Sequence, residues 1–580
     1  PPGPSEVEVC LELDRPAYSR HAFCFVRDGR PADLLAVTLR AGVPPLPAPP
    51  RALEHPYLLF DRDGLEDLRR KARRAPFPAL TGSPARGAEE PPDAGLPPSG
   101  QGNPLAITPR CMNWFRVAKE SMLRDGAGGR NPACRRVWEL LPPAAQETFR
   151  DVVRTVEPTP GQLEVLTGAL NEMLARRDFH DAAAFAEVPL PEEAVAMLRR
   201  APGELTDAEL FRLNRTILQC TIECMPPFGL DLAARAARCL EKWVLGGDER
   251  LAHAATRWVQ AADQCMILSP HTDLHEGGVT GSLALAYDAF WPDLSPEERQ
   301  IWVRVLSRLL ELHLRTARKR HWNCTTIANA NPVCNGGGGL AALALLTERP
   351  DLARESLALA RKLIWNWADY CNGPNGGNTE GAQYWQYGAE NFLRFASALE
   401  RVVGSDDGLL SGPSVRRQMG MIRVGLCADG CLHGVNDTIP MPVGGSIAWW
   451  VAGRTGEPLA LWYGDHAQRV YRRLRAAGRE APYRAEGLWA VLFRPDVPEA
   501  VDQPPLPTAF CLDDIQYAVA RSGTNYDCGL VAGLKGSRPP YTHHNQPDTG
   551  SFFLDVRGER LLIDPGYFKD TSDAVFMTTR

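Results

Sequence analysis

The chain has 580 residues, of which 64 are basic and 70 acidic, and its formal net charge is −6. This balance excludes the strongly basic surface of a general nucleic-acid binder, and a composition that is 44% hydrophobic and 23% charged excludes a disordered chain. The longest apolar stretches, such as residues 340–346, are far shorter than the ~20 residues of a membrane-spanning helix, so we expect no membrane span.

The N-terminal part is predicted to mix short strands, one helix and irregular segments. Residues 1–50 contain two alternating stretches, 7–13 and 23–26, that favour strands, and they end in a proline-rich linker. Residues 51–109 combine a charged amphipathic helix over 61–74 with an irregular Pro/Gly/Ala-rich segment. No charged and apolar leader precedes Pro1, so we expect either that a signal peptide has been removed or that the chain is a fragment.

Residues 110–480 are predicted to form a large helical domain. Periodic segments rich in Ala, Leu and Arg alternate with short breakers, for example at 206–220, 248–263, 296–316, 339–346 and 352–370. No fixed sequence period recurs, which disfavours a solenoid of near-identical repeats and favours helix pairs packed into a toroid or bundle.

Residues 481–580 are predicted to form a β domain. Short strand-like runs separated by Gly, Pro and Asp occur at 488–493, 516–520, 528–534, 551–556 and 560–563. The sequence therefore predicts a multidomain α and β protein, with a helical domain followed by antiparallel β structure.

The first polar motif runs from His321 to Gly339 and includes Trp322, Asn331 and Asn335. Its asparagines precede a glycine run and an apolar helix, and amides beside the free N–H groups of a helix N-terminus suit an anionic ligand such as a carboxylate. The alternative is that these asparagines are caps and turn formers.

The second motif runs from Asn375 to Gly388 and includes Glu380. If Thr379 caps a helix, Tyr384 and Tyr387 share one helix face and Trp385 points away. Aromatic side chains beside an open Gly-rich loop suit stacking on a sugar, whereas the alternative is an aromatic stripe buried between helices.

The third motif, from Tyr541 to Asp555, carries the adjacent histidines His543 and His544 on a loop that enters a strand. Packing rarely explains a pair of loop histidines. Asp564 closes the strand that follows.

Three motifs in this order resemble those of the heparinase II/III-like polysaccharide lyases and the related oligoalginate lyases. They are Asn-Pro-Val-Cys-Asn-Gly, Glu-Gly-x-x-Tyr-Trp-x-Tyr-Gly and His-Asn-x-Pro-Asp-x-Gly-Ser-Phe, the last followed by Gly-Glu-x-Leu-Leu-x-Asp-Pro-Gly-Tyr. The resemblance covers about residues 55–75 and 205–580. It implies an incomplete (α/α) toroid followed by an antiparallel β-sandwich, and a periplasmic or secreted location. The β-sandwich is expected to be incomplete, because the chain reaches Arg580 after roughly half of its strands.

The family cleaves uronic-acid-containing glycans by β-elimination, which leaves a 4,5-unsaturated product. By resemblance, Asn331 binds the uronate carboxylate, and Tyr384 and His544 are the catalytic acid–base residues. The further residues expected to bind substrate are Trp322, Asn335, Glu380, Tyr387 and His543. Such a reaction needs donors that stabilise an enolate-like dianion, a base for the C5 proton and an acid for O4. Whether Tyr384 or His544 is the base depends on substrate stereochemistry and stays open.

We expect no zinc of the usual family kind and no other cofactor. Many family members carry a second histidine two positions after the catalytic one, as part of a structural zinc site, but this chain has Gln546 there. Asp564 would be the one remaining ligand, and a single carboxylate does not hold zinc.

The expected partner is an acidic polysaccharide or oligosaccharide. One basic run, from Arg315 to Arg320, precedes the first motif, and with only one such run we favour weakly sulfated or unsulfated uronates such as alginate. Three alternatives stay open: a uronate C5-epimerase, a non-catalytic glycan-binding relic, and a glycoside hydrolase that would use Glu380 and Asp437 as its carboxylate pair.

Overall fold

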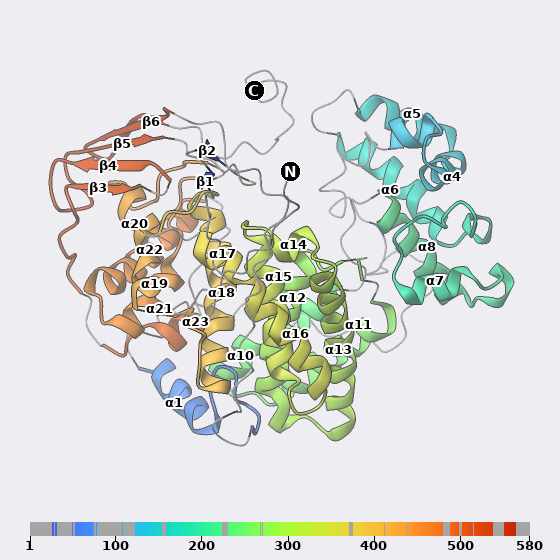
Figure 1. The fold of residues 1–580 in the computed structure, drawn as a ribbon, viewed down its shortest axis with the longest axis horizontal. Helices are drawn as coiled ribbons and strands as arrows, with labels where there is room; N and C mark the ends of the chain where they lie inside the picture. Colours follow the sequence, from blue (N-terminus) through green and yellow to red (C-terminus); the bar gives the residue numbers. More distant parts are fainter. Residues whose placement is uncertain are drawn as a thin grey trace.

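The structure is a computed structural model that is mostly helical, with a C-terminal antiparallel sheet (Figure 1). It describes residues 26–27, 30–31, 49, 53–74, 77, 107, 122–153, 158–222, 230–266, 268–269, 271–370, 375–410, 412–436, 438–478, 488–497, 501–513, 515–536, 544 and 550–563. The predicted strand at residues 7–13 lies outside this part. The other N-terminal strand prediction overlaps a short antiparallel pair, β1 (Val26–Arg27) with β2 (Arg30–Pro31).

The first helices of the predicted helical domain surround a hydrophobic core of their own. Figure 1 shows them as a separate group in cyan and green. They are η2 (Met122–Ala127), α4 (Pro132–Leu140), α5 (Pro143–Val152), α6 (Pro160–Leu174), η3 (Arg177–Phe179), α7 (Glu192–Leu198), η4 (Pro202–Glu204) and α8 (Asp207–Ile222).

The helices that follow share the largest hydrophobic core, apart from the short α14, whose Cys324 belongs to a small separate cluster. They are α9 (Leu230–Ala237), α10 (Cys239–Gly246), α11 (Arg250–Cys265), α12 (Leu274–Phe290), η5 (Trp291–Asp293), α13 (Pro296–Arg318), α14 (Trp322–Thr325), α15 (Ala330–Ala344), α16 (Pro350–Leu363), α17 (Trp365–Tyr370), α18 (Ala382–Val403), α19 (Gly412–Arg417), α20 (Gly420–Gly425), α21 (Gly445–Thr455), α22 (Pro458–Ala476) and α23 (Leu488–Phe493). No helix in the described part of the chain is long and apolar enough to cross a membrane.

Glycines let three helices of this core pack unusually closely. A Cβ atom on Gly337 of α15 would lie 2.0 Å from the carbonyl oxygen of Gly277 on α12, and one on Gly339 would lie 2.3 Å from the ring of Phe395 on α18. Gly277 faces Cys334, and Gly281 faces Gly337 further along both helices, so α12 and α15 run parallel. The pairs formed by α15 and α18 advance in the same sense, from Pro332 with Gly388 to Gly336 with Asn391. The three helices therefore begin at the same end of the domain.

Helix α1 (Arg62–Ala72) confirms the predicted N-terminal helix, and it links two helices far apart in the sequence. Arg69 donates hydrogen bonds to the carbonyls of Trp243 and Val244 on α10, both at 3.3 Å. Lys71 donates to the carbonyl of Arg494, directly after α23, at 2.6 Å. Figure 1 shows α1 below the ring of helices, close to α10 and α23.

Five antiparallel strands form one sheet in the order β3 (Ala509–Leu512), β4 (Tyr517–Arg521), β5 (Leu530–Lys535), β6 (Phe552–Val556) and β7 (Glu559–Leu562). Alternate residues face the helices: Arg521 donates to the carbonyls of Arg423 and Leu426, at 2.9 and 3.1 Å, and Phe553 stacks on His433. These contacts fix the sheet against α20 and the loop that follows it.

The predicted fold class, a helical toroid followed by antiparallel β structure, is confirmed, with one sheet of the expected sandwich in the described residues. Two local predictions are wrong. Residues 488–493 form helix α23 and not a strand, and α15 begins at Ala330, so the glycine run lies inside the helix and does not precede it.

Candidate active site

Two half-buried tyrosines lie on one face of α18 near its start. The helix begins after Gly381, whose φ is +87° and where a Cβ atom would lie 2.5 Å from Thr438 Oγ1, so only glycine suits this position. Tyr384 and Tyr387 are half-buried, whereas Trp385 between them is fully buried. The shared face of the tyrosines is confirmed. The predicted Thr379 cap is wrong, because Gly381 is the N-cap residue and no side chain caps the helix.

His544 meets Tyr384 from the β domain. It lies in the connection between β5 and β6, and its imidazole ring lies parallel to the phenol ring, with ring centroids 3.5 Å apart and an interplanar angle of 9°. The helical domain and the sheet domain thus each place one potential acid–base group at the same point. The neighbouring His543 lies outside the described residues.

Asn331 and Asn335 lie inside the protein, near the start of α15. The amide nitrogen of Asn331 donates to the carbonyls of Cys324, Thr326 and Leu363 at 3.1, 2.8 and 2.9 Å. Asn335 donates to Cys324 O at 2.9 Å and to Asn331 Oδ1 at 3.2 Å. Both side chains are fully buried, so they hold α14 and the loop after it against α15.

His313 completes this buried network. Its Nε2 lies 3.2 Å from Asn335 Oδ1, and burial lowers the pKa of His313 to about 4. The ring is therefore neutral at physiological pH, and with Nε2 protonated it can donate to the amide oxygen.

Glu380 joins the loop before α18 to the start of α15. Its carboxylate accepts hydrogen bonds from the backbone N–H of Asn329 at 2.7 Å and from the Asn329 side chain at 2.9 Å, and it is fully buried. The positive end of the α15 dipole stabilises a carboxylate at this position. Asp437, its suggested partner in a hydrolase, lies outside the described residues.

A loop of which the sequence analysis named only Asp437 supports the start of α18. Asn436 donates to the carbonyl of Thr379 at 2.7 Å, and Val435 and Thr438 pack against Gly381. His433, in the same loop, stacks on Phe553 of β6 with ring centroids 3.6 Å apart. The loop thus contacts both the segment before Tyr384 and the strand that follows the His544 connection.

Trp322 is an exposed aromatic side chain, with 46% of its surface accessible, at the first residue of α14. The preceding His321 stacks on His271 with ring centroids 3.9 Å apart. Burial lowers the pKa of both histidines below the usual value. An exposed tryptophan of this kind can stack on a sugar, and its role in binding stays a prediction.

A cavity of about 510 Å³ opens beside the tyrosine face of α18. Helices α9, α10, α12, α18 and α23 surround it, and Tyr387 lies in its wall together with Glu390 and Arg394, one and two turns further along α18. Its volume falls within the range of about 300–1,000 Å³ that is usual for small-molecule sites. The sequence analysis missed Arg394, although its helical spacing from Tyr387 pointed to the same face.

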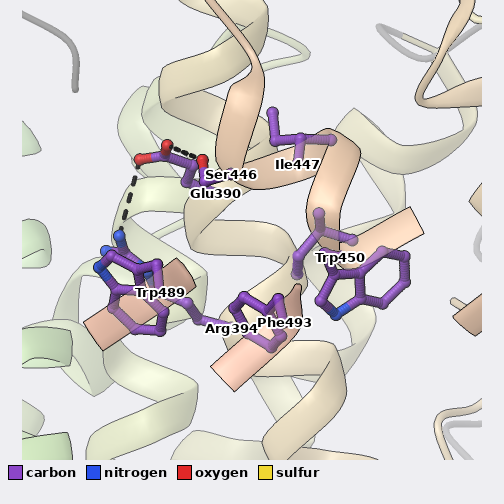
Figure 2. A pocket seen from close by; sticks show the side chains of 8 residues that line it. Glu390, Arg394, Ser446, Ile447, Trp450, Trp489 and Phe493 are labelled. Carbon is purple, nitrogen blue, oxygen red and sulfur yellow. Dashed lines mark hydrogen bonds and ion pairs between the residues drawn. The ribbon is translucent and has the colours of Figure 1, made fainter. Parts of the chain in front are cut away.

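The cavity shares Glu390, Arg394 and Trp489 with a smaller apolar pocket, whose lining Figure 2 shows. Glu390 accepts hydrogen bonds from Ser446 Oγ at 2.5 Å and Gln386 Nε2 at 3.0 Å. The Arg394 guanidinium lies 4.1 Å from the ring centroid of Trp489 and 3.6 Å from a Glu390 oxygen. The residues therefore combine a positive charge with aromatic surface at the edge of a cavity.

In the described part of the chain, no three His, Cys, Asp or Glu side chains lie close enough together to hold a metal ion. Gln546 and Asp564, the two positions on which the zinc argument depends, lie outside that part. The expectation that this chain lacks the zinc site stays a prediction.

The chain matches no protein-family model and no curated protein. Solved structures similar to it include the heparan sulfate lyase HepC from Pedobacter heparinus, at 14% identity over 77% of this chain and 68% of that chain, with a TM-score of 0.41. A mutant of that lyase matches at 15% identity over 65% of this chain and 52% of its own, with a TM-score of 0.41. A structure described as the heparinase III-BT4657 gene product matches at 12% identity over 81% and 68%, with a TM-score of 0.40. The chain thus spans about half to two thirds of the length of these proteins.

Proposed function

We propose that this protein is a polysaccharide lyase that cleaves a uronic-acid-containing glycan by β-elimination. The observation that carries the proposal is the parallel contact of the Tyr384 and His544 rings, 3.5 Å apart. A phenol and an imidazole at one point supply the two proton transfers that the elimination requires, removal of the C5 proton and protonation of the leaving O4.

The surroundings of the pair favour an acidic substrate. Helices α12, α15 and α18 run parallel, so the positive ends of their dipoles gather at the end of the domain where Tyr384 lies. The C5 proton becomes easier to remove when the carboxylate and the developing enolate are stabilised, which is usually the largest contribution to catalysis of this type.

In this proposal Asn331 binds the substrate carboxylate after its amide nitrogen gives up one of its three carbonyl contacts. Asn335 offers a matched control, because it is equally buried and donates to the same Cys324 carbonyl. If Asn331 binds the carboxylate, Asn331→Ala lowers kcat/KM much more than Asn335→Ala for an equal loss of thermal stability. Equal losses of activity would contradict a distinct role for Asn331 in binding the carboxylate.

The proposal is tested by following the ultraviolet absorbance of the conjugated double bond that elimination forms and hydrolysis does not. Alginate, heparan sulfate, chondroitin and hyaluronan are supplied in turn. The absorbance is expected to rise with one of them, and Tyr384→Phe and His544→Gln are expected to abolish the rise. Tyr526→Phe, a half-buried tyrosine of the β domain, is expected to retain activity. A flat trace from folded protein on all four substrates would overturn the proposal.

A further inference from the structure

We propose that the cavity beside α18 binds a second anionic group of the glycan, a carboxylate or sulfate, through the guanidinium of Arg394. The inference rests on the proposed function, since it assigns to the cavity a part of the same substrate beyond the sugar that is cleaved. It makes Arg394 a residue that selects glycans by the position of their charges.

Arg394 is a largely buried cation whose donors are not used. Its side chain is 20% exposed, and its contact with Glu390, at 3.6 Å, is longer than a hydrogen bond. No hydrogen bond joins it to any residue in the described part of the chain, although a guanidinium carries five N–H donors. The guanidinium nitrogens are not fully buried, so their donors are accessible, and a carboxylate or sulfate entering the cavity can accept two of them at once.

The neighbours of Arg394 hold it in place without neutralising it completely. Trp489 lies under the guanidinium plane at 4.1 Å, and Figure 2 shows Glu390 turned toward both Ser446 and Arg394. Because Ser446 and Gln386 already donate to Glu390, the negative charge of this carboxylate is stabilised without a direct hydrogen bond from Arg394.

A second arginine shows what a satisfied version of this arrangement looks like. Arg454 also lies over a tryptophan, Trp450, at 5.2 Å. It makes two hydrogen bonds of 2.8 Å to the two oxygens of Glu400, which is the bidentate geometry that arginine prefers. Arg394 has the aromatic partner but lacks the bidentate acceptor, and it faces a cavity.

Two further cations line the cavity. Arg238 and Lys242, at the start of α10, line it and form no ion pair with any described residue. Glu241 also lines the cavity, and it has a partner of its own. A concave site with several cations concentrates anions, so an acidic oligosaccharide is favoured over a neutral one.

The spacing along α18 sets the length of the ligand. Arg394 lies ten residues after Tyr384, which corresponds to about 15 Å along the helix axis. The group held by Arg394 is thus several sugar rings away from the bond that is cleaved, and we expect oligosaccharides to bind more tightly than disaccharides.

The test measures binding separately from turnover. Calorimetric titrations use the Tyr384→Phe protein as background, with size-defined alginate and heparan sulfate hexasaccharides as probes. Adding Arg394→Gln is expected to raise Kd about 10- to 100-fold for at least one probe, because a charged bidentate contact is lost. Arg394→Lys keeps the charge and is expected to raise Kd less. Arg454→Gln is the matched control and is expected to leave Kd unchanged.

Arg238, which is exposed, and Lys242, which is half-buried, provide a second variant. Arg238→Gln combined with Lys242→Gln is expected to raise Kd several-fold, and this increase disappears at high salt. An unchanged Kd in both the Arg394→Gln and the double variant, with wild-type thermal stability, would overturn the inference, as would a folded protein that binds neither probe. Arg394-dependent binding by a protein without lyase activity refutes the proposed function and keeps the inference. Lyase activity whose KM is insensitive to Arg394→Gln supports the proposed function and refutes the inference about Arg394.

Discussion

Replacing Gly337 by alanine is expected to destabilise the helical domain, against the intrinsic preference of helices for alanine. The new Cβ atom would lie 2.0 Å from the carbonyl oxygen of Gly277, whereas real Cβ contacts are essentially never shorter than 3.0 Å. Both atoms are bound to the backbone of packed helices, so α12 and α15 must separate by about 1 Å. Overpacking of this kind costs about 1–3 kcal/mol or more, and the helix preference returns about 1 kcal/mol. Because the contact is with rigid backbone, we expect a net loss of roughly 2 kcal/mol.

Gly278→Ala is the matched control, one residue from Gly277 on the same helix. Its Cβ would meet atoms no closer than 3.9 Å, which is ordinary van der Waals contact. This variant is expected to gain about 0.5–1 kcal/mol, because alanine replaces glycine inside a helix without strain. Urea unfolding, followed by circular dichroism and by tryptophan fluorescence, measures both changes. Equal shifts for the two variants, or a Gly337→Ala protein as stable as the wild type, would refute the close packing of α12 and α15.

Three further predictions concern buried ionisable side chains. Burial lowers the pKa of His433 to about 3, so below pH 6.5 the unfolded chain binds a proton that the folded chain does not bind. The free energy of unfolding should therefore fall by about 1.4 kcal/mol per pH unit between pH 6.5 and 3. In a series of urea unfolding experiments at different pH, this free energy should depend less steeply on pH for His433→Gln. Burial alone would lower the pKa of His55, but the carboxylates of Asp288 and Glu348 outweigh burial and raise this pKa. The stabilisation by protonated His55 is therefore complete below pH 6.5 and is lost as the pH rises through the raised pKa. Asp288→Asn should remove this pH dependence from thermal melts. Asp465→Asn should cost about 3–5 kcal/mol by denaturant unfolding, because it leaves the buried Arg494 without its bidentate partner, and a cost below 1 kcal/mol would contradict the pairing.

The sequence predicted the helical and β parts well, because their hydrophobic periods differ over long segments. It failed where the period is ambiguous. The six residues Leu488–Phe493 are apolar throughout and suit a buried strand or a short helix equally. The glycine run in α15 was interpreted as a loop because glycine has a low helix propensity, but the need for close contact with α12 and α18 outweighs that propensity.

The candidate site was only partly predictable, because its contacts between distant segments leave no local sequence pattern. The shared face of Tyr384 and Tyr387 follows from helical spacing alone, and the structure confirms it. The contact of Tyr384 with His544 joins two domains, and no local pattern encodes it. Arg394 and Trp489 lie in segments whose patterns indicate only packing, so their juxtaposition required the structure.

In the proposed mechanism, Tyr384 and His544 together carry out β-elimination. The most direct measurement follows the ultraviolet absorbance of the unsaturated product for wild type, Tyr384→Phe and His544→Gln, on each uronate glycan in turn. We expect a rise for the wild type on one glycan and a loss of at least about 100-fold in each variant, since general acid–base groups contribute roughly that much or more. Wild-type activity that survives both substitutions, or a wild-type trace that stays flat on every glycan, would contradict it.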